Sequence, residues 1–74
     1  MTHHVSLGQW LKQRRMALDL TQNELAEQVG CAEETIRKLE AGVRRPSKQI
    51  AQRLADVLFT TPDERQTFMQ VARG

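Results

Sequence analysis

The sequence predicts an all-α protein, a compact bundle of five short helices around one core. Its 74 residues suffice for one small domain. Apolar residues recur three and four positions apart along the chain, and no segment shows the alternation of a strand. Three helix-start signals add to this periodicity, each a hydroxyl residue followed three positions later by an acid or its amide: Ser6 and Gln9, Thr21 and Glu24, and Thr61 and Glu64.

The first helix is expected to begin after Ser6, with residues 1–5 as a flexible tail and residues 6–74 as the domain. Its inner stripe is predicted to contain Leu7, Leu11, Leu18 and either Arg14 or Arg15. Trp10 lies beside this stripe. We expect its indole to pack against the C-terminal part of the chain, since this is its best source of buried contacts.

Two further helices are predicted between Thr21 and Gly42. Leu25 and Val29 share one face of the first of these helices, and Gly30 ends it because a residue without Cβ enters the left-handed region at little cost. The second helix has Ile36 and Leu39 on its inner face, and Gly42 ends it in the same way.

The spacing within this pair indicates a helix-turn-helix unit. Two helices that cross over a short turn need a small residue at the crossing, a glycine in the turn and bulky apolar residues where they meet. Ala26, Gly30, Ile36 and Leu39 supply these at the fifth, ninth, fifteenth and eighteenth positions counted from Gln22. In such units the second helix enters the major groove of DNA.

The last two helices follow a basic loop that contains Pro46. The fourth is predicted over residues 48–58, with five inward-facing apolar residues: Ile50, Ala51, Leu54, Val57 and Leu58. The fifth is predicted to begin with Pro62 in its first position and to run to about residue 72, burying Phe68 and Val71.

Charge is distributed unevenly, although the net charge is only +2. Between residues 19 and 34 there are five acids and no base: Asp19, Glu24, Glu27, Glu33 and Glu34. Between residues 37 and 53 there is one acid, Glu40, and six bases: Arg37, Lys38, Arg44, Arg45, Lys48 and Arg53. A basic run is usually a solvated face, but this run begins on the second helix of the pair and therefore favours contact with nucleic acid.

The remaining composition argues against several classes of protein. The single cysteine, Cys31, has no nearby histidine, and His3 and His4 lie in the tail, so we expect no enzyme site, metal site or cofactor. No apolar segment is long enough to cross a membrane and no secretory signal is found, so a cytoplasmic protein is expected. Cys31 fits half-buried packing better than a reactive thiol at a helix start, although both readings follow from its position.

The stretch TQNELAEQVGCAEETIRKLEAGVRRPS resembles the DNA-binding domains of the Cro and phage-repressor type, and the likeness covers residues 7–58. This resemblance implies the five-helix fold of those domains, with the second and third helices as the reading unit. It also implies an ion pair between Arg15 and Glu40, a pairing that composition alone does not predict.

The resemblance further implies roles on DNA. Ala32, Glu33, Glu34 and Lys38 match positions that face base edges. Gln22 matches a residue that holds a phosphate, and Arg37, Arg44 and Arg45 are placed to reach phosphates. Glu33 and Glu34, at the reading positions, differ from the residues found there in many relatives. Their carboxylates either accept hydrogen bonds from cytosine amino groups, or they only interact favourably with the positive N-terminal end of the helix.

These observations predict a sequence-specific regulator of transcription from a bacterium or phage that binds double-stranded DNA. The abrupt end of the chain, after a helix, also suits the N-terminal domain of a larger regulator, and a homodimer on DNA is compatible with both. The alternative is a protein-interaction module, such as an antitoxin-like domain, that keeps the fold without the DNA role. The acids Glu33 and Glu34 and the low net charge favour this alternative.

Overall fold

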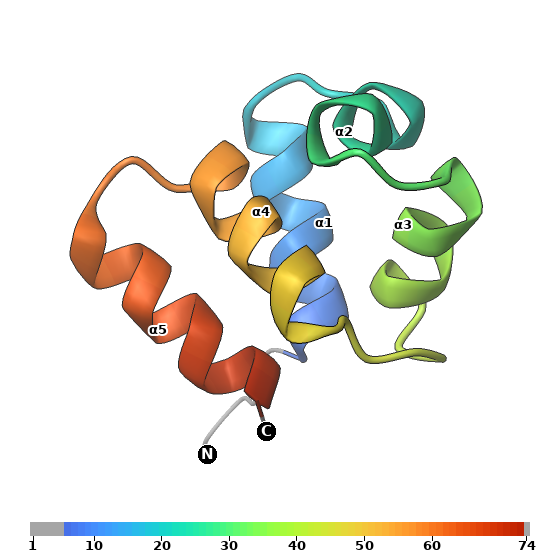
Figure 1. The fold of residues 1–74 in the computed structure, drawn as a ribbon. Helices are drawn as coiled ribbons and strands as arrows, with labels where there is room; N and C mark the ends of the chain where they lie inside the picture. The colour runs from blue at the N-terminus through green and yellow to red at the C-terminus, as the bar shows by residue number, and fades with distance from the viewer. Residues whose placement is uncertain (1–5, 74) are drawn as a thin grey trace, which may run out of the picture.

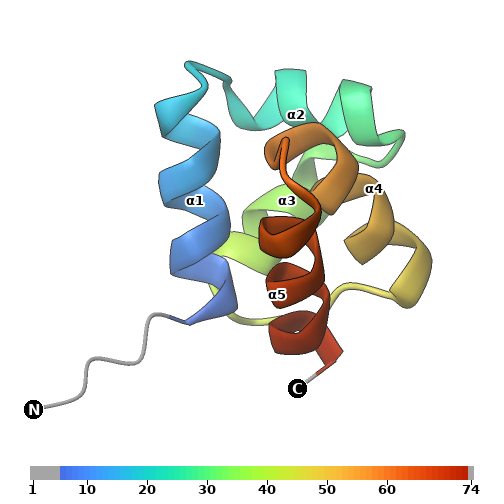
Figure 2. The same cartoon turned by 90° about the vertical axis from the view of Figure 1, so that its left-hand side faces the viewer.

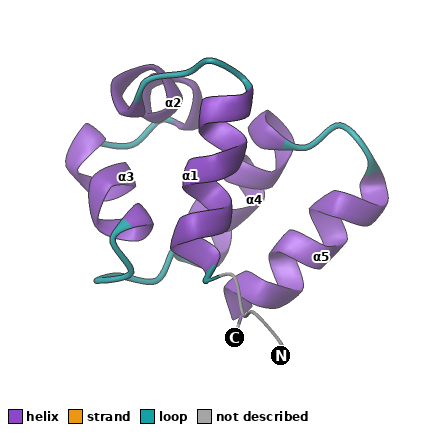
Figure 3. Cartoon of the chain, turned by 180° about the vertical axis from the view of Figure 1, so that it is seen from behind, coloured by secondary structure: helices purple, strands orange, loops and turns teal. Residues whose placement is uncertain are grey.

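The computed structural model describes residues 6–73, so the predicted tail over residues 1–5 and the last residue lie outside it. Within the described residues the chain forms helices and loops and no strand (Figure 3). The all-α prediction with five helices is therefore confirmed. The helices are α1 (Leu7–Ala17), α2 (Gln22–Val29), α3 (Glu33–Glu40), α4 (Lys48–Leu58) and α5 (Pro62–Arg73).

The helices begin where the sequence places caps. The Ser6 hydroxyl accepts from the Gln9 amide at the start of α1, and the Thr21 hydroxyl accepts from the Glu24 amide at the start of α2. In both helices the side chain three positions on also accepts from the cap's own N–H, so each capping box is complete. These local bonds satisfy N–H groups that would otherwise have no partner within the helix.

The five helices pack in three groups around one core. Figure 1 shows α1 and α4 in the middle, α2 and α3 on one side and α5 on the other, and Figure 2 shows the same arrangement from the side. The buried apolar residues come from every helix: Leu11, Leu25, Ala26, Val29, Ile36, Leu39, Ala51, Leu54, Ala55, Leu58, Phe59, Phe68 and Ala72. Ala55, Phe59 and Ala72 had no predicted place in this core.

Two predicted core residues lie at the surface. Val71 is 41% exposed because Phe68 and Ala72, four positions apart, define the buried face of α5. Leu18 is 39% exposed because α1 ends there and Asp19 turns the chain through a left-handed conformation with φ of 59°. The predictions that these two side chains face inward were therefore wrong. Ile50 and Val57 are half-buried and pack against the core.

An aromatic cluster attaches α5 to α1 and α4. The ring of Trp10 lies 5.2 Å from that of Phe59 and 5.4 Å from that of Phe68, measured between centroids. The tilted orientations are favourable for aromatic pairs. The Arg14 guanidinium lies over the Phe59 ring at 5.6 Å and donates to the carbonyl of Leu58 at the end of α4. The predicted packing of Trp10 against the C-terminal part is confirmed.

Gly8 allows α1 to approach the end of α3 closely. A Cβ atom at this position would lie 2.5 Å from the backbone oxygen of Glu40 and 2.6 Å from that of Leu39. Real Cβ atoms do not come this near to backbone oxygens, so the absence of a side chain sets the distance between the two helices. The position of α3 therefore depends on a glycine outside the helix-turn-helix.

Candidate nucleic-acid interface

The helix-turn-helix has the local geometry that its spacing predicts. Gly30 ends α2 with φ of 85°, and the N–H groups of Gly30 and Cys31 both donate to the Ala26 carbonyl. Ala26 is 2% exposed and Ile36 is fully buried, so a small and a branched side chain occupy the region where α2 packs on α3.

The outer face of α3 is polar. Ile36 and Leu39 are buried, whereas the residues on the opposite face are exposed: Glu33, Glu34, Arg37 and Lys38. Their spacing of one, four and five positions places all four on one side of the helix. Ala32 caps this helix by its backbone alone and is also exposed. Of the four residues predicted to face base edges, Glu33, Glu34 and Lys38 thus share the outer face of α3. Ala32 is exposed at the start of this helix.

Glu34 forms ion pairs with the two bases of α3. Its Oε1 atom lies 3.6 Å from Lys38 Nζ and 3.8 Å from Arg37 Nη2. The exposed fractions of the Glu34 and Arg37 side chains are 61%, and that of Lys38 is 47%. Exposed pairs of this kind contribute little to stability. They do place a negative charge between the two cations on the outer face.

Behind this face, Arg15 of α1 and Glu40 of α3 form a bidentate ion pair. Arg15 donates from Nε at 2.6 Å and from Nη2 at 3.2 Å, and its Nη1 atom donates to the carbonyl of Leu20. The exposed fractions of the Arg15 and Glu40 side chains are 11% and 4%. One guanidinium therefore joins α1, the segment before α2 and the end of α3, and the pair that the resemblance implies is present.

Glu40 also accepts a bond that sequence reasoning did not anticipate. The Gln22 amide nitrogen, Nε2, donates to Glu40 Oε1 at 3.1 Å, and Gln22 is half-buried. The side chain expected to hold a phosphate is thus tied by its amide nitrogen to the ion pair. No sequence spacing identifies this bond, because Gln22 and Glu40 lie on different helices and meet only through the packing of α2 on α3.

The basic residues continue beyond α3. Arg44 and Arg45 lie in the loop before α4, and both are exposed. Of the earlier bases, Arg14 and Arg15 are committed to the internal bonds described above, which leaves them unsuited to DNA contact. Arg53 of α4 approaches the end of α2, where its Nη1 atom donates to the Val29 carbonyl at 3.4 Å. This contact was also not predicted from the sequence.

Cys31 lies half-buried in the turn between α2 and α3. Burial raises the pKa of the Cys31 thiol above its ordinary value, and the nearby charge of Arg53 opposes this shift. A raised pKa is the opposite of what a reactive thiol at a helix start would have. The packing role is therefore the one that the structure supports.

The helix-turn-helix family matches residues 11–65, which include every helix of the reading unit and most of the core. The chain belongs to the helix-turn-helix family. This agrees with its resemblance to domains of the Cro and phage-repressor type. A curated relative, "Uncharacterized HTH-type transcriptional regulator" from Methanothermobacter thermautotrophicus, is 46% identical over 48 residues, which cover 65% of this chain and 70% of the relative. No solved structure matches significantly.

Within this helix-turn-helix domain, the residues predicted to contact DNA fall into three groups. The first lies on the outer face of α3 and at its cap, Ala32, and the second consists of Arg44 and Arg45 in the next loop. Gln22 stands apart, at the start of α2 and bonded to Glu40. No helix within residues 6–73 is both long and apolar enough to cross a membrane, and no group of three metal-ligating side chains occurs there.

Proposed function

We propose that this helix-turn-helix domain binds double-stranded DNA in a sequence-specific manner and regulates transcription, with α3 in the major groove. The observation that carries the proposal is the division of α3 into a buried apolar side and an exposed polar side that bears Arg37 and Lys38. The naming of the curated relative as an HTH-type transcriptional regulator supports the same conclusion. Lys38 then donates to O6 or N7 of guanine, a pairing favoured by major-groove geometry.

Phosphates on either side of the groove are held by two further parts of the domain. Arg37, Arg44 and Arg45 reach one strand. The first turn of α2 reaches the other strand through the backbone N–H groups of Gln22 and Asn23, which have no acceptor within the helix. The bond from Gln22 to Glu40 orients the Gln22 side chain and leaves its oxygen for a bridging water.

The proposal extends to the assembly on DNA. A homodimer places two α3 helices in successive major grooves, so its half-sites are separated by about 34 Å, or one turn of the duplex. Further C-terminal domains of a longer regulator would hold the two copies together. The proposal includes a cytoplasmic location in a bacterial cell, where a regulator of this kind meets its DNA.

Selection from a random duplex library tests the proposal directly. Rounds of binding and amplification are expected to return one motif, and its symmetry reports whether one or two copies bind. A matched selection with Lys38→Ala should return a motif altered at one position, whereas Arg73→Ala on α5 should return the original. Failure to enrich any motif, with no binding to duplex at low salt, would reject the proposed function.

A second function is favoured by the acids on the same face. Glu33 and Glu34 lie on α3 beside the two bases, and Glu34 pairs with both of them, which lowers the positive potential there. A protein partner would accept such a mixed surface more readily than a phosphate backbone would. Retention of the Lys38→Ala, Arg44→Ala double variant on immobilised duplex and on heparin distinguishes the two functions. Unchanged retention would favour the protein partner.

A further inference from the structure

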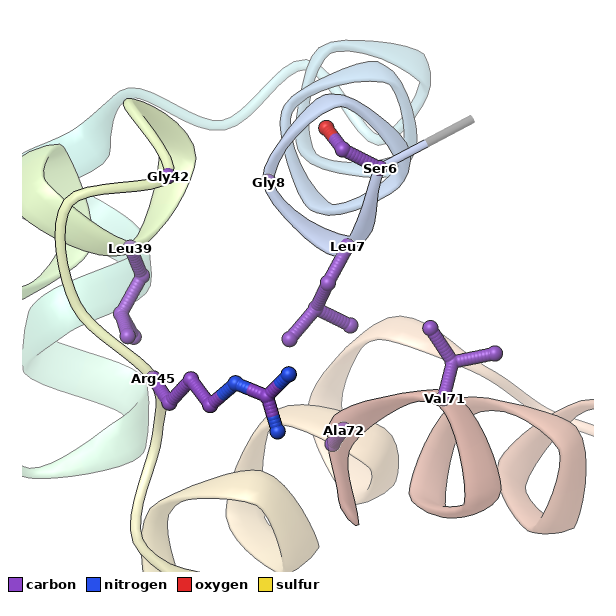
Figure 4. Close-up of a pocket in the computed structure, with 8 residues that line it drawn as sticks. All are labelled: Ser6, Leu7, Gly8, Leu39, Gly42, Arg45, Val71 and Ala72. Carbon is purple, nitrogen blue, oxygen red and sulfur yellow. The ribbon is translucent and has the colours of Figure 1, made fainter. Parts of the chain in front are cut away.

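A hollow outside the α3 reading face is formed by three parts of the chain. Figure 4 shows it between the start of α1, the loop after α3 and the last turn of α5. Its volume is about 290 Å³, just below the range typical of ligand sites. Most of its side chains are aliphatic, and the lining residues used below are Leu7, Leu39, Arg45, Val71 and Ala72.

Arg45 supplies the positive charge of this hollow. Figure 4 shows its side chain extending from the loop across the space, with the guanidinium between Leu7 and Ala72. Within residues 6–73 this guanidinium has no hydrogen bond or ion pair. A fork of N–H donors beside aliphatic walls is complementary to a ligand with an anionic head and an apolar body.

The aliphatic walls explain why a simple anion is a poor fit. Leu7, from α1, and Val71, from α5, both line the space (Figure 4), and Val71 is the side chain that the sequence had placed in the core. Its 41% exposure gives apolar surface that a ligand could cover. Burial of an aliphatic chain against these residues adds a favourable contribution that inorganic phosphate or acetate cannot supply.

We propose that this hollow is an effector site for a small aliphatic carboxylate, whose carboxylate binds Arg45 and whose chain packs against Leu7, Leu39 and Val71. Occupancy withdraws the Arg45 guanidinium from the DNA phosphate that it would otherwise contact. The ligand site stands on the geometry of the hollow alone. The coupling to DNA rests on the proposed function, because it requires Arg45 to contact a phosphate in the complex.

Hexanoate is a suitable probe for the site, followed through the backbone amide signals of the ¹⁵N-labelled protein. Saturable shifts are expected at Gly8, Gly42 and Ala72, which lie around the hollow. Acetate lacks the chain and hexan-1-ol lacks the charge, so each should bind at least about tenfold more weakly. Equal affinity for acetate and hexanoate would overturn the apolar part of the site, and absence of shifts at these amides would overturn the site itself.

Three variants test the assigned contacts. Arg45→Gln should weaken hexanoate binding about tenfold, because a charge-assisted bidentate interaction becomes neutral. Val71→Asp, at an exposed position, should weaken it at least as much by repelling the carboxylate and pairing with Arg45. Arg44→Gln removes the same charge one residue away and should leave the affinity for hexanoate unchanged. Equal effects of Arg44→Gln and Arg45→Gln would contradict a specific site.

Competition with DNA is measured separately. Saturating hexanoate should lower the affinity for the selected duplex about fivefold, at the low end of typical coupling between two sites. The Arg45→Gln variant should bind DNA more weakly and lose this response. Hexanoate binding with unchanged DNA affinity would overturn the coupling alone. Hexanoate binding by a protein that binds no duplex would support the ligand site while rejecting the proposed DNA function.

Discussion

Arg15 and Glu40 form a buried ion pair between α1 and the end of α3, with 2.6 Å between Nε and Oε2. Both members of this pair make further bonds: the guanidinium also donates to the Leu20 carbonyl, and the carboxylate also accepts from Gln22. No buried side-chain nitrogen or oxygen within the described residues lacks a partner. The helix-turn-helix is thus attached to α1 through a satisfied polar network as well as through apolar packing.

Removing one member of this pair should destabilise the protein much more than removing both. Arg15→Met or Glu40→Leu alone leaves an uncompensated buried charge, and each should lower the free energy of unfolding by about 3 kcal/mol. The double variant replaces the pair by apolar groups and should lie within about 1 kcal/mol of the wild type. Urea unfolding followed by the fluorescence of Trp10, the only tryptophan, measures all four proteins. Additive losses in the double variant would contradict this view.

Gly8→Ala should be unusually costly for a substitution of this kind. The added methyl group would meet the backbone oxygens of Leu39 and Glu40, so α3 has to move, and we expect a loss of about 1–3 kcal/mol. Gly42→Asn is the comparison, since Gly42 has φ of 76° and open space around it. Asparagine tolerates that conformation, so a small loss is expected. Thermal unfolding that ranked the two variants in the reverse order would exclude close helix contact as the role of Gly8.

The parts of the fold that follow from local sequence could be predicted, and those that depend on packing could not. The caps at Ser6 and Thr21 and the turn at Gly30 are set by bonds and dihedral angles within a few residues. Val71 was wrongly predicted to be buried because helical periodicity identifies an apolar face of α5 but not where that face ends. The buried side of α5 is determined by Phe68, which packs on Trp10 from a distant part of the chain.

In the candidate interface, too, some features could be predicted from local sequence and others depend on tertiary packing. The exposed positions of Glu34 and Lys38 follow from helical spacing around buried Ile36. The bond between Gln22 and Glu40 does not, because it depends on how α2 crosses α3. The direction of the Arg45 side chain also depends on tertiary structure, since α1 and α5 supply the walls of the hollow that it enters.

A phosphate contact by Arg44 predicts a specific change in salt dependence. Arg44→Ala should weaken binding to all duplexes to a similar extent and reduce the slope of log affinity against log salt by about 0.9, the value for one phosphate. Arg73→Ala is a control for charge, since it removes the same charge from the last turn of α5, where no residue is predicted to contact DNA. Fluorescence anisotropy at several salt concentrations gives both slopes. An unchanged slope for Arg44→Ala would show that Arg44 does not contact a phosphate.

Cys31 should react slowly with iodoacetamide in the folded protein. Burial raises the pKa of its thiol, so at a given pH the folded protein has a smaller fraction of reactive thiolate than the unfolded chain. The rate should therefore increase on unfolding in urea at constant pH, and in the folded protein it should rise as the pH passes above the ordinary thiol pKa. Arg53→Gln removes the charge that opposes the shift and should slow the reaction further. A folded rate above the unfolded rate would contradict the packing role.

Glu34→Gln distinguishes restraint of the neighbouring bases by Glu34 from acceptance of a hydrogen bond from cytosine. If Glu34 only restrains the bases, its removal frees Lys38 and Arg37 from pairs at 3.6 and 3.8 Å and reduces repulsion of phosphates. Affinity for random and selected duplexes should then rise together, by about two- to fivefold, in keeping with the weak energies of exposed ion pairs. If Glu34 instead accepts from a cytosine amino group, affinity for the selected duplex should fall at least about fivefold while affinity for random duplex rises. Because the ion pairs are exposed, we expect the first outcome.

Glu33→Gln is the matched control, since it removes an equal charge one position earlier and breaks neither pair, so it should raise both affinities less than Glu34→Gln does.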